Sequence, residues 1–228
     1  MNEQLADDLF FGGKTFGAKS AFFSIVIATY NREKTIVRAL NSLINQTETD
    51  WEAIIVDDGS TDNTFLKIRE LLEKNSNIKY LKQGNRGAAA SKNIGLQNAK
   101  GKFFTFLDSD DEYEPNHLES RKRILNENPG AEFLSGGLRI IGNPFVPDRF
   151  NSSKQIHLDK CEIGGTFFIL KELFFFLKGF HDIHLGEDAD LYERVLKSGK
   201  LMLKTEIPTY IYHKETEGSV TNLFNKIS

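Results

Sequence analysis

The sequence predicts an α/β fold with a mainly parallel central sheet and helices on both faces. Three observations support this prediction. Short apolar runs rich in β-branched residues recur along the chain, as expected of strands that are buried on both faces. Amphipathic segments with helical spacing separate these runs, which is the pattern of βαβ units. Polar clusters follow several of the runs, at the place where open α/β sheets bind ligands.

Length and composition fit one globular domain. The chain has 228 residues, of which 39% are hydrophobic and 27% charged, and its formal net charge is -3 at pH 7. This charge balance gives no support to nucleic-acid binding. The single cysteine, Cys161, and an acidic start that lacks the features of a signal peptide predict a cytoplasmic protein. The phenylalanine-rich run 167–180 is too short and too interrupted by charge to span a membrane.

The first half of the chain alternates regularly between strands and helices. Residues 1–21 show no period and are expected to form an N-terminal tail. Four buried strands are predicted at 22–29, 52–58, 78–83 and 102–108. The helices that connect them are expected at 36–44, after a cap at Ser60, Thr61 or Asp62, in the alanine-rich stretch that ends near Lys100, and from Pro115 to the residue before Pro129.

The second half is less regular. A strand is predicted over 133–141 and another near 166–170, and a short helix follows through 172–177. A well-patterned helix carries Leu191 and Val195 on one side and stops at Gly199. The last strand is expected at 207–213. No linker, repeat or low-complexity tract divides the chain, so a single domain is expected from 22 to 228.

Asp108-Ser109-Asp110 is the sharpest candidate site, because it follows a predicted buried strand. Alternate side chains of an extended segment point the same way, so the two carboxylates can share a neighbourhood. A divalent cation with oxygen ligands, Mg²⁺ or Mn²⁺, would relieve their repulsion and could hold phosphates. An isolated motif of this kind is more often an acidic turn, in which Asp110 or Asp111 caps the next helix.

Asp57 and Asp58 end another predicted strand, where a carboxylate can accept hydrogen bonds from a base or a ribose. Tyr30, at the end of the first strand, offers a ring for stacking, although both features also fit an ordinary turn. The glycine-rich loops of dinucleotide-binding and Walker-type sites are absent from the sequence.

Glu187 and Asp188 open the helix that carries Leu191. One of these carboxylates could be a general base toward an acceptor hydroxyl, while the structural alternative is favourable placement near the helix dipole. His213 ends the last predicted strand, and a lone histidine is usually structural. The sequence contains no zinc-type spacing of histidines or cysteines.

Taken together and in order, these motifs resemble those of family 2 glycosyltransferases with the GT-A fold. The segments are SIVIATYNRE, IIVDDGSTDNT, NRGAAASKNIGLQNAKGKFFTFLDSDDEYEP, LKGF and GEDADLYERVLKSGK, and the resemblance covers about residues 22–215. It implies a nucleotide-sugar half at 22–113 and an acceptor half at 114–215. It also implies transfer of a hexose or N-acetylhexosamine from a nucleotide diphosphate donor, most often UDP, to a glycan or lipid-linked acceptor, usually with inversion. Polysaccharide biosynthesis is the implied setting.

The resemblance also assigns roles to individual residues. Ala28, Tyr30 and Asp58 would line the nucleobase pocket, and Asp188 would be the catalytic base with Glu187 in support. The remaining implied donor-site residues are Arg32, Arg86, Lys92, Asp108 and Ser109, and the implied ligands of Mn²⁺ or Mg²⁺ are Asp110, Asp108 and His213. Lys92 stands where relatives often have arginine; it keeps the charge but loses the bidentate geometry, so Arg86 is a second candidate for phosphate contact.

Two alternatives to an active transferase remain open on the sequence. One is a non-catalytic module that binds a nucleotide sugar, and the other is a nucleotidyltransferase, although ATYNRE lacks the glycine-rich basic loop of that class. The phenylalanine-rich run 167–180 is interpreted as core packing. The alternative is an apolar face toward a lipid-linked acceptor, which would make the protein peripheral at the inner face of the membrane.

Overall fold

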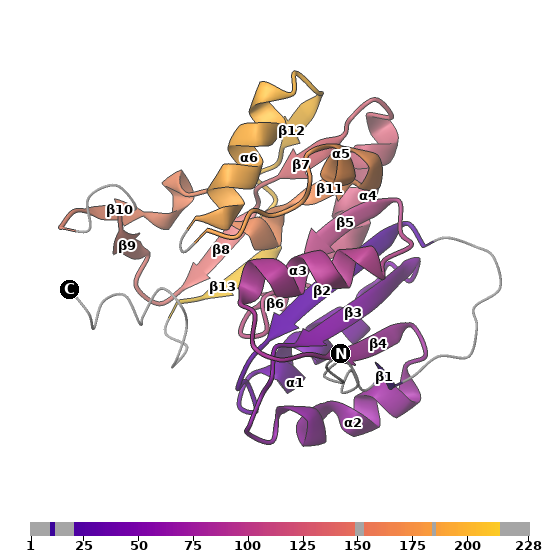
Figure 1. The fold of residues 1–228 in the computed structure, drawn as a ribbon. Helices are drawn as coiled ribbons and strands as arrows, with labels where there is room; N and C mark the ends of the chain where they lie inside the picture. Colours follow the sequence, from indigo (N-terminus) through magenta and orange to yellow (C-terminus); the bar gives the residue numbers. More distant parts are fainter. Residues whose placement is uncertain (1–9, 12–20, 149–152, 184–185, 215–228) are drawn as a thin grey trace, which may run out of the picture.

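The structure is a computed structural model that describes residues 10–11, 21–148, 153–183 and 186–214 (Figure 1). Its centre is an eight-stranded sheet with the strand order β1-β4-β3-β2-β5-β11-β7-β12. The strands of this sheet are β1 (Phe10–Phe11), β2 (Phe23–Thr29), β3 (Trp51–Asp57), β4 (Ile78–Lys82), β5 (Phe103–Phe106), β7 (Phe133–Ser135), β11 (Phe168–Leu170) and β12 (Met202–Lys204). The predicted α/β class is confirmed.

The four strands β2 to β5 form one parallel block of the sheet, and β7 and β12 form a further parallel pair. β2 pairs in parallel with both β3 and β5, and β3 pairs in parallel with β4. β11 lies antiparallel between β5 and β7, which joins the two halves of the chain into one sheet. Phe10–Phe11, within the predicted tail, form β1, which pairs antiparallel with β4 at one edge of the sheet. The rest of that tail up to residue 20 lies outside the described residues.

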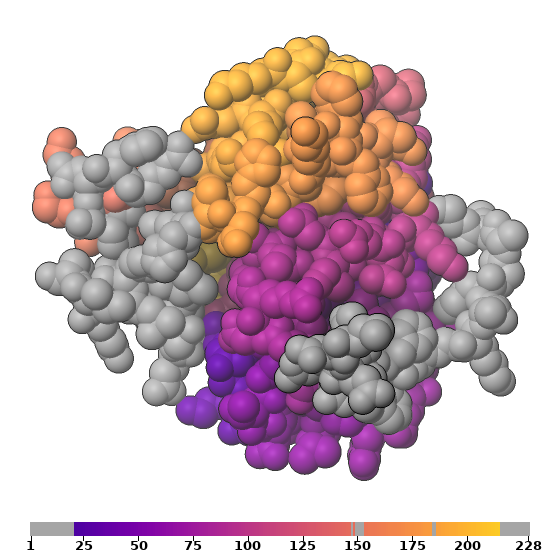
Figure 2. All heavy atoms as spheres, viewed as in Figure 1, coloured from indigo at the N-terminus to yellow at the C-terminus, as the bar shows by residue number. Residues whose placement is uncertain are grey.

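In the described part of the chain, six α-helices cover the two faces of the sheet. They are α1 (Ile36–Ile44), α2 (Thr64–Lys74), α3 (Ala88–Gln97), α4 (His117–Glu127), α5 (Lys171–Phe176) and α6 (Glu187–Lys197). Alternate residues of a strand point to opposite faces, so Ile25 and Ile27 of β2 pack with α1, α2 and α4, whereas Val26 packs with α3, α5 and α6. Figure 2 shows α3 and the α5–α6 half meeting across the front surface.

The predicted strand over 133–141 is divided in the structure. Gly136 and Gly137 have φ values of 94° and 82°, a region that favours glycine, and the chain leaves the central sheet between them. The part that follows, β8 (Leu138–Ile141), belongs to a second sheet with β13 (Tyr210–His213) and β6 (Glu112–Tyr113). The sequence did not predict this break, because the apolar residues on both sides of the two glycines fit a single strand.

Helix starts also differ slightly from the sequence expectation. α2 begins at Thr64, and the carboxylate of Asp62 accepts a hydrogen bond of 2.9 Å from the Thr64 amide, so Asp62 does satisfy a helix-terminal donor. α4 begins at His117, two residues after Pro115. A hairpin of β9 (Phe145–Pro147) and β10 (Gln155–His157) and two short 3-10 turns, η1 (Leu158–Lys160) and η2 (Gly164–Thr166), complete the second half.

The phenylalanine-rich run packs mostly into the core, as interpreted from the sequence. Phe167, Phe168, Phe174 and Phe180 are each at most 3% exposed. Phe175 and Phe176 of α5 are 45% and 71% exposed, and the Phe175 ring also packs edge-on against the buried Phe104 ring, with 5.9 Å between the ring centres. Among the described residues, no helix combines the length and apolarity needed to cross a bilayer.

Candidate active site

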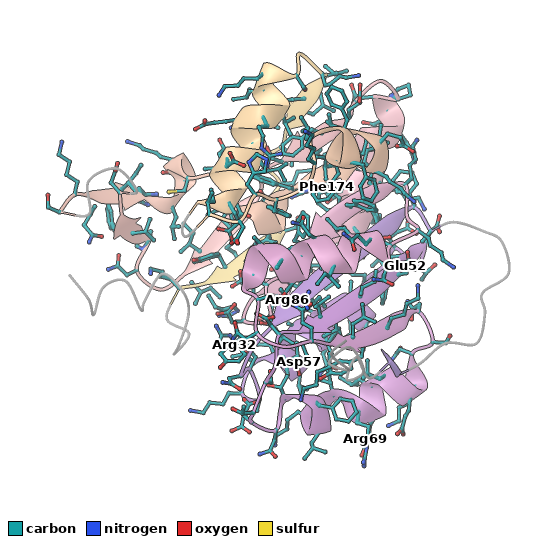
Figure 3. The ribbon with its side chains drawn as sticks, viewed as in Figure 1. Arg32, Glu52, Asp57, Arg69, Arg86 and Phe174 are labelled. Carbon is teal, nitrogen blue, oxygen red and sulfur yellow. The ribbon has the colours of Figure 1, made fainter. Side chains whose placement is uncertain are left out.

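The polar clusters that follow β2, β3 and β5 meet at one edge of the sheet. Because these strands are parallel, their carboxyl ends lie together. Figure 3 shows Arg32, Asp57 and Arg86 gathered on this side, while Glu52, at the start of β3, lies at the opposite end. The loops are joined directly: the Asn31 amide donates to Ser60 Oγ at 2.9 Å, and the Thr61 amide donates to Asn31 Oδ1 at 2.9 Å.

The two aspartates at the end of β3 have different surroundings. Asp57 is fully buried and accepts hydrogen bonds from the Tyr80 hydroxyl (2.5 Å) and the Ser60 amide (2.7 Å), so it stabilises the turn. Asp58 accepts from Gln83 Nε2 and from the amides of Arg86 and Gly87, at 2.7 to 2.8 Å. A carboxylate has about four acceptor positions, so Asp58 keeps about one for a further donor such as a nucleobase N–H.

Tyr30 and Ala28 lie near Asp58, and they differ in their exposure to solvent. The Tyr30 side chain is 43% exposed at the edge of the sheet and is available for stacking. Ala28 is partly buried near the end of β2, and the backbone oxygen of the next residue, Thr29, accepts from the Asp58 amide at 2.8 Å. This arrangement is compatible with the nucleobase pocket that the sequence implies.

An acidic cluster follows β5. Asp108 and Asp110 flank Ser109, which is 5% exposed, and Asp111 is 2% exposed. Asp111 does not cap α4; its two oxygens accept from the Tyr210 hydroxyl and from the His213 amide, both at 2.8 Å. The acidic segment is therefore fixed by β13, a strand from the far end of the chain.

Burial makes these carboxyl groups unusually hard to ionise. It raises the pKa of Asp108 to about 6, against the opposing effect of the Lys92 ammonium, and the charges of Asp188 and Asp110 add to the rise. Burial also raises the pKa of Asp110, although Arg32 opposes the shift, and it raises the pKa of Asp111 well above the ordinary value. The positive side chains nearby therefore do not fully offset the cost of ionising these buried carboxyl groups.

Two arginines and a histidine surround Asp110 and Glu112. Arg32 Nε lies 3.9 Å from Asp110 Oδ2, and Arg38 donates to the backbone oxygen of Asp110. Arg38 Nε is also 3.3 Å from Glu112 Oε1. His213 Nε2 lies 2.6 Å from the same Glu112 oxygen. His213 thus lies at the acidic cluster, where its ring contacts Glu112.

The oxygen ligands that the acidic cluster offers fit a hard divalent cation in part. Asp108 and Asp110 offer carboxylate oxygens, and the raised pKa values of the cluster mark a place where added positive charge is favourable. In the part of the chain that the structure describes, however, no three His, Cys, Asp or Glu side chains are arranged to hold a metal ion together. His213 would have to exchange Glu112 for the metal to act as the third ligand.

Asp188 lies at the first turn of α6, and both of its oxygens are engaged. Oδ1 is 3.1 Å from the Lys92 ammonium, and Oδ2 accepts from the Gly164 amide at 2.9 Å. Glu187 Oε1 lies 3.5 Å from the same ammonium. Burial disfavours the charged lysine, but the carboxylates of Asp188, Asp108 and Glu187 outweigh it and raise the pKa of Lys92.

Lys92 therefore connects the two parts of the site. It is 5% exposed, lies 5.0 Å from the centre of the Phe180 ring, and faces the acids of both the β5 loop and α6. Its ammonium is held by carboxylates, so contact with a phosphate would require it to leave them. Arg86, the other candidate for phosphate contact, is exposed at the start of α3.

The structure adds residues to the site that sequence reasoning did not identify. They are Arg38, Glu112, Gly164 and Tyr210. In the sequence, Arg38 fits the exposed face of a predicted helix and Tyr210 fits a predicted strand, so neither was singled out. The adjacent pair Gly164-Gly165 was the available signal, since paired glycines often mark a close approach of the backbone to another group.

Comparison with known proteins assigns these features to a family. Residues 24–175 match the profile of glycosyl transferase family 2. The chain is 33% identical over 183 residues to the Escherichia coli enzyme UDP-Glc:alpha-D-GlcNAc-diphosphoundecaprenol beta-1,3-glucosyltransferase WfgD, covering 78% of this chain and 71% of that protein. It is 30% identical over 191 residues to the Campylobacter jejuni GalNAc(5)-diNAcBac-PP-undecaprenol beta-1,3-glucosyltransferase, covering 76% of this chain and 59% of that protein.

Solved structures share the fold. S. aureus TarS 1–349 in complex with UDP-GlcNAc superposes with a TM-score of 0.73 at 24% identity, covering 88% of this chain and 60% of that chain. The mannosyltransferase PcManGT from Pyrobaculum calidifontis, in complex with GDP-Man and Mn²⁺, superposes with a TM-score of 0.68 at 20% identity, covering 91% and 60%. The chain thus spans about three fifths of the length of these structures.

Proposed function

Since this chain belongs to the family 2 glycosyltransferases, we propose that it transfers a sugar from a nucleotide diphosphate donor to a hydroxyl of a lipid-linked glycan acceptor. The observation that carries the proposal is the position of Lys92 between Asp188 and Asp108, which brings a candidate base and the acidic loop after β5 to one site. UDP-sugar is the proposed donor, because the E. coli relative is named for UDP-Glc and a structural neighbour binds UDP-GlcNAc.

In the proposed mechanism, Asp188 accepts the proton of the attacking acceptor hydroxyl. Its carboxylate is held on one side by the Gly164 amide and on the other by Lys92, so its orientation is set before substrate binds. The hydroxyl oxygen forms the new bond to the anomeric carbon as the bond to the nucleoside diphosphate breaks. One displacement of this kind inverts the anomeric configuration and needs no side-chain nucleophile.

The leaving diphosphate is proposed to lie against the acidic loop after β5 and the nearby arginines. Asp108 and Asp110 would hold Mn²⁺ or Mg²⁺, and the bound cation would supply positive charge to the diphosphate oxygens. Arg32 and Arg86 are proposed to add donors on the solvent side of the same edge, and Glu187 is proposed to support Asp188 through their shared contact with Lys92.

Calorimetric titration of UDP, GDP and dTDP, with and without Mn²⁺, tests the donor site. One nucleotide is expected to bind in a metal-dependent manner, and Asp110→Asn is expected to weaken this binding about tenfold or more, because a charged ligand of the cation is lost. Glu73→Gln, which removes one charge from the exposed face of α2, is the matched control and should bind as wild type does. Absence of any nucleotide binding with metal present would refute the proposed donor site.

A turnover assay separates the transferase from its alternatives. Hydrolysis or transfer of a sugar nucleotide by the wild type supports the proposal. Nucleotide binding without turnover in a broad acceptor screen would instead favour a non-catalytic binding module, and release of diphosphate from a nucleoside triphosphate would favour a nucleotidyltransferase.

A lipid-linked acceptor would bring the protein to the cytoplasmic face of a membrane as a peripheral protein. Both named relatives act on undecaprenol-linked acceptors, and α5 carries the exposed Phe175 and Phe176 with the exposed Lys178 just beyond it. We expect Phe176→Ser to reduce co-sedimentation with phosphatidylglycerol vesicles about tenfold, from the loss of one buried aromatic side chain. Leu66→Ser, on the exposed face of α2, should have no effect. A wild type that does not bind vesicles would exclude this localisation.

A further inference from the structure

The turn η2 brings a backbone amide directly against the proposed base. Gly164 is buried, and its N–H donates to Asp188 Oδ2 at 2.9 Å. Asp188 is 24 residues further along the chain, so this contact is made by the fold and not by local sequence. With Lys92 on Oδ1, it fixes both oxygens of the carboxylate and therefore its plane.

The same position has no room for a side chain. A Cβ atom on Gly164 would lie under 3.0 Å from Asp188 Cγ and both carboxylate oxygens, 2.6 Å in the case of Oδ2. Real Cβ atoms essentially never approach other atoms so closely. The absence of a Cβ at this residue is thus what allows the amide and the carboxylate to meet.

The turn itself is held firmly by its other neighbours. Thr166 Oγ1 donates to the Ile163 oxygen at 2.8 Å and accepts from the Gly136 amide at 3.2 Å. Gly165 faces the ring and hydroxyl of Tyr210, which is fully buried. The side chain of Asp188 is 24% exposed, so it has solvent on one side. If an added Cβ on Gly164 pushes the turn and the Asp188 carboxylate apart, we expect the carboxylate to move, because the turn is held by more contacts.

We propose that Gly164 is a positioning residue that holds the Asp188 carboxylate in the orientation needed to accept the acceptor proton. This inference rests on the proposed function and assigns a role to the η2 turn within it. In this role Gly164 acts through its hydrogen bond to Asp188. A methyl group at this position is expected to turn the carboxylate toward solvent, which breaks the 2.9 Å hydrogen bond and removes the base from its place.

The test compares Gly164→Ala with Gly130→Ala. In Gly130→Ala, the added Cβ would meet only an ordinary contact, 3.7 Å from a methyl of Leu201. We expect Gly164→Ala to lower kcat at least about a hundredfold, as for a misplaced catalytic group, while the dissociation constant of the donor nucleotide and the unfolding midpoint change little. Gly130→Ala should retain wild-type kcat. A kcat of Gly164→Ala within about threefold of wild type would overturn the proposal.

A double variant shows whether Gly164→Ala lowers kcat through Asp188. In an Asp188→Asn background, Gly164→Ala should cause almost no further loss of kcat, because the group through which it acts is already removed. Independent losses that multiply would show a merely structural role and overturn the proposal.

Hydrogen exchange gives a readout that does not need turnover. The Gly164 amide should be protected in the wild type and should lose protection in Asp188→Ala, measured by NMR. An unprotected amide in the wild type would contradict the contact on which the inference rests. Protection together with a wild type that turns over no sugar nucleotide would instead refute the proposed function, and with it the catalytic role of the contact, while the contact itself stands.

Discussion

Replacing Asp188 by asparagine is expected to lower kcat about 10²–10⁴-fold, the range usual for loss of a general base. The amide has nearly the same size as the carboxylate but cannot accept the proton of the acceptor hydroxyl. It also presents a donor to one of two groups, the Lys92 ammonium and the Gly164 amide, that now donate to the carboxylate. Affinity for the donor nucleotide should change little, because Asp188 lies in the acceptor half.

Asp190→Asn is the matched control, since Asp190 is also in the first turn of α6. Its carboxylate is 2.7 Å from Arg194 Nη2 and 3.1 Å from His181 Nδ1, so its charge is paired on a different side of the helix end from that of Asp188 with Lys92. The control is expected to retain kcat within about threefold and to lose at most about 1 kcal/mol of stability, as for partly exposed ion pairs. A kcat of Asp188→Asn within tenfold of wild type would show that another group is the base.

Replacing Lys92 by methionine is expected to lower both stability and activity. Breaking a buried charge pair typically costs about 3–5 kcal/mol, and the 22–24% exposure of Glu187 and Asp188 favours the lower end of that range. Urea unfolding measures the loss. Activity should fall as well, because Asp188 loses the partner of its Oδ1 oxygen.

The stability deficit of Lys92→Met should depend on pH. Burial raises the pKa of Asp108 to about 6 even though Lys92 lowers it, so removing Lys92 raises the folded-state pKa further above the unfolded value. A carboxyl group with a raised folded-state pKa favours the folded state when protonated and disfavours it when ionised. The deficit is therefore expected to grow as the pH rises through about 6 and to shrink below it, measured in EDTA to remove metal.

Lys92→Arg tests charge separately from shape. Arginine is the residue often found here in the family that the sequence resembles, and it keeps the positive charge that faces Asp188, Asp108 and Glu187. We expect most of the stability and activity to be retained. Equal losses in Lys92→Arg and Lys92→Met would indicate that packing against Phe180 and Phe106, rather than charge, is the main contribution of Lys92.

The local signals in the sequence were sufficient for the architecture of the first half. The apolar run of β2 is buried on both faces as predicted, with Ile25 and Ile27 on one face and Val26 on the other. The helical stripe Ile36, Ala39, Leu40 and Leu43 is buried as the spacing predicts. The polar residues after β2, β3 and β5 are brought to one edge because parallel strands share their carboxyl ends. These features arise from short-range patterning, which one sequence displays directly.

The second half was less predictable because its strands are short and its pairings are distant. The predicted strand over 207–213 becomes β13, which pairs with β8 and β6 and not with the central sheet. The motif of the acidic loop is local, but the hydrogen bond from Tyr210 to Asp111 joins residues 99 positions apart. Neither the partner nor the sheet is encoded by the spacing of nearby residues.

Sequence patterns alone predict the α/β class, the acids at the strand ends and the helix that opens with Glu187 and Asp188. The pairing of these groups depends on the folded chain: Lys92 pairs with Asp188 across 96 positions, and His213 with Glu112 across 101. Local patterning fixes which face or end of an element a side chain occupies, since it depends on the backbone period. The neighbours that set its charge and orientation come from other elements, and they are defined when the two halves pack around the joined sheet.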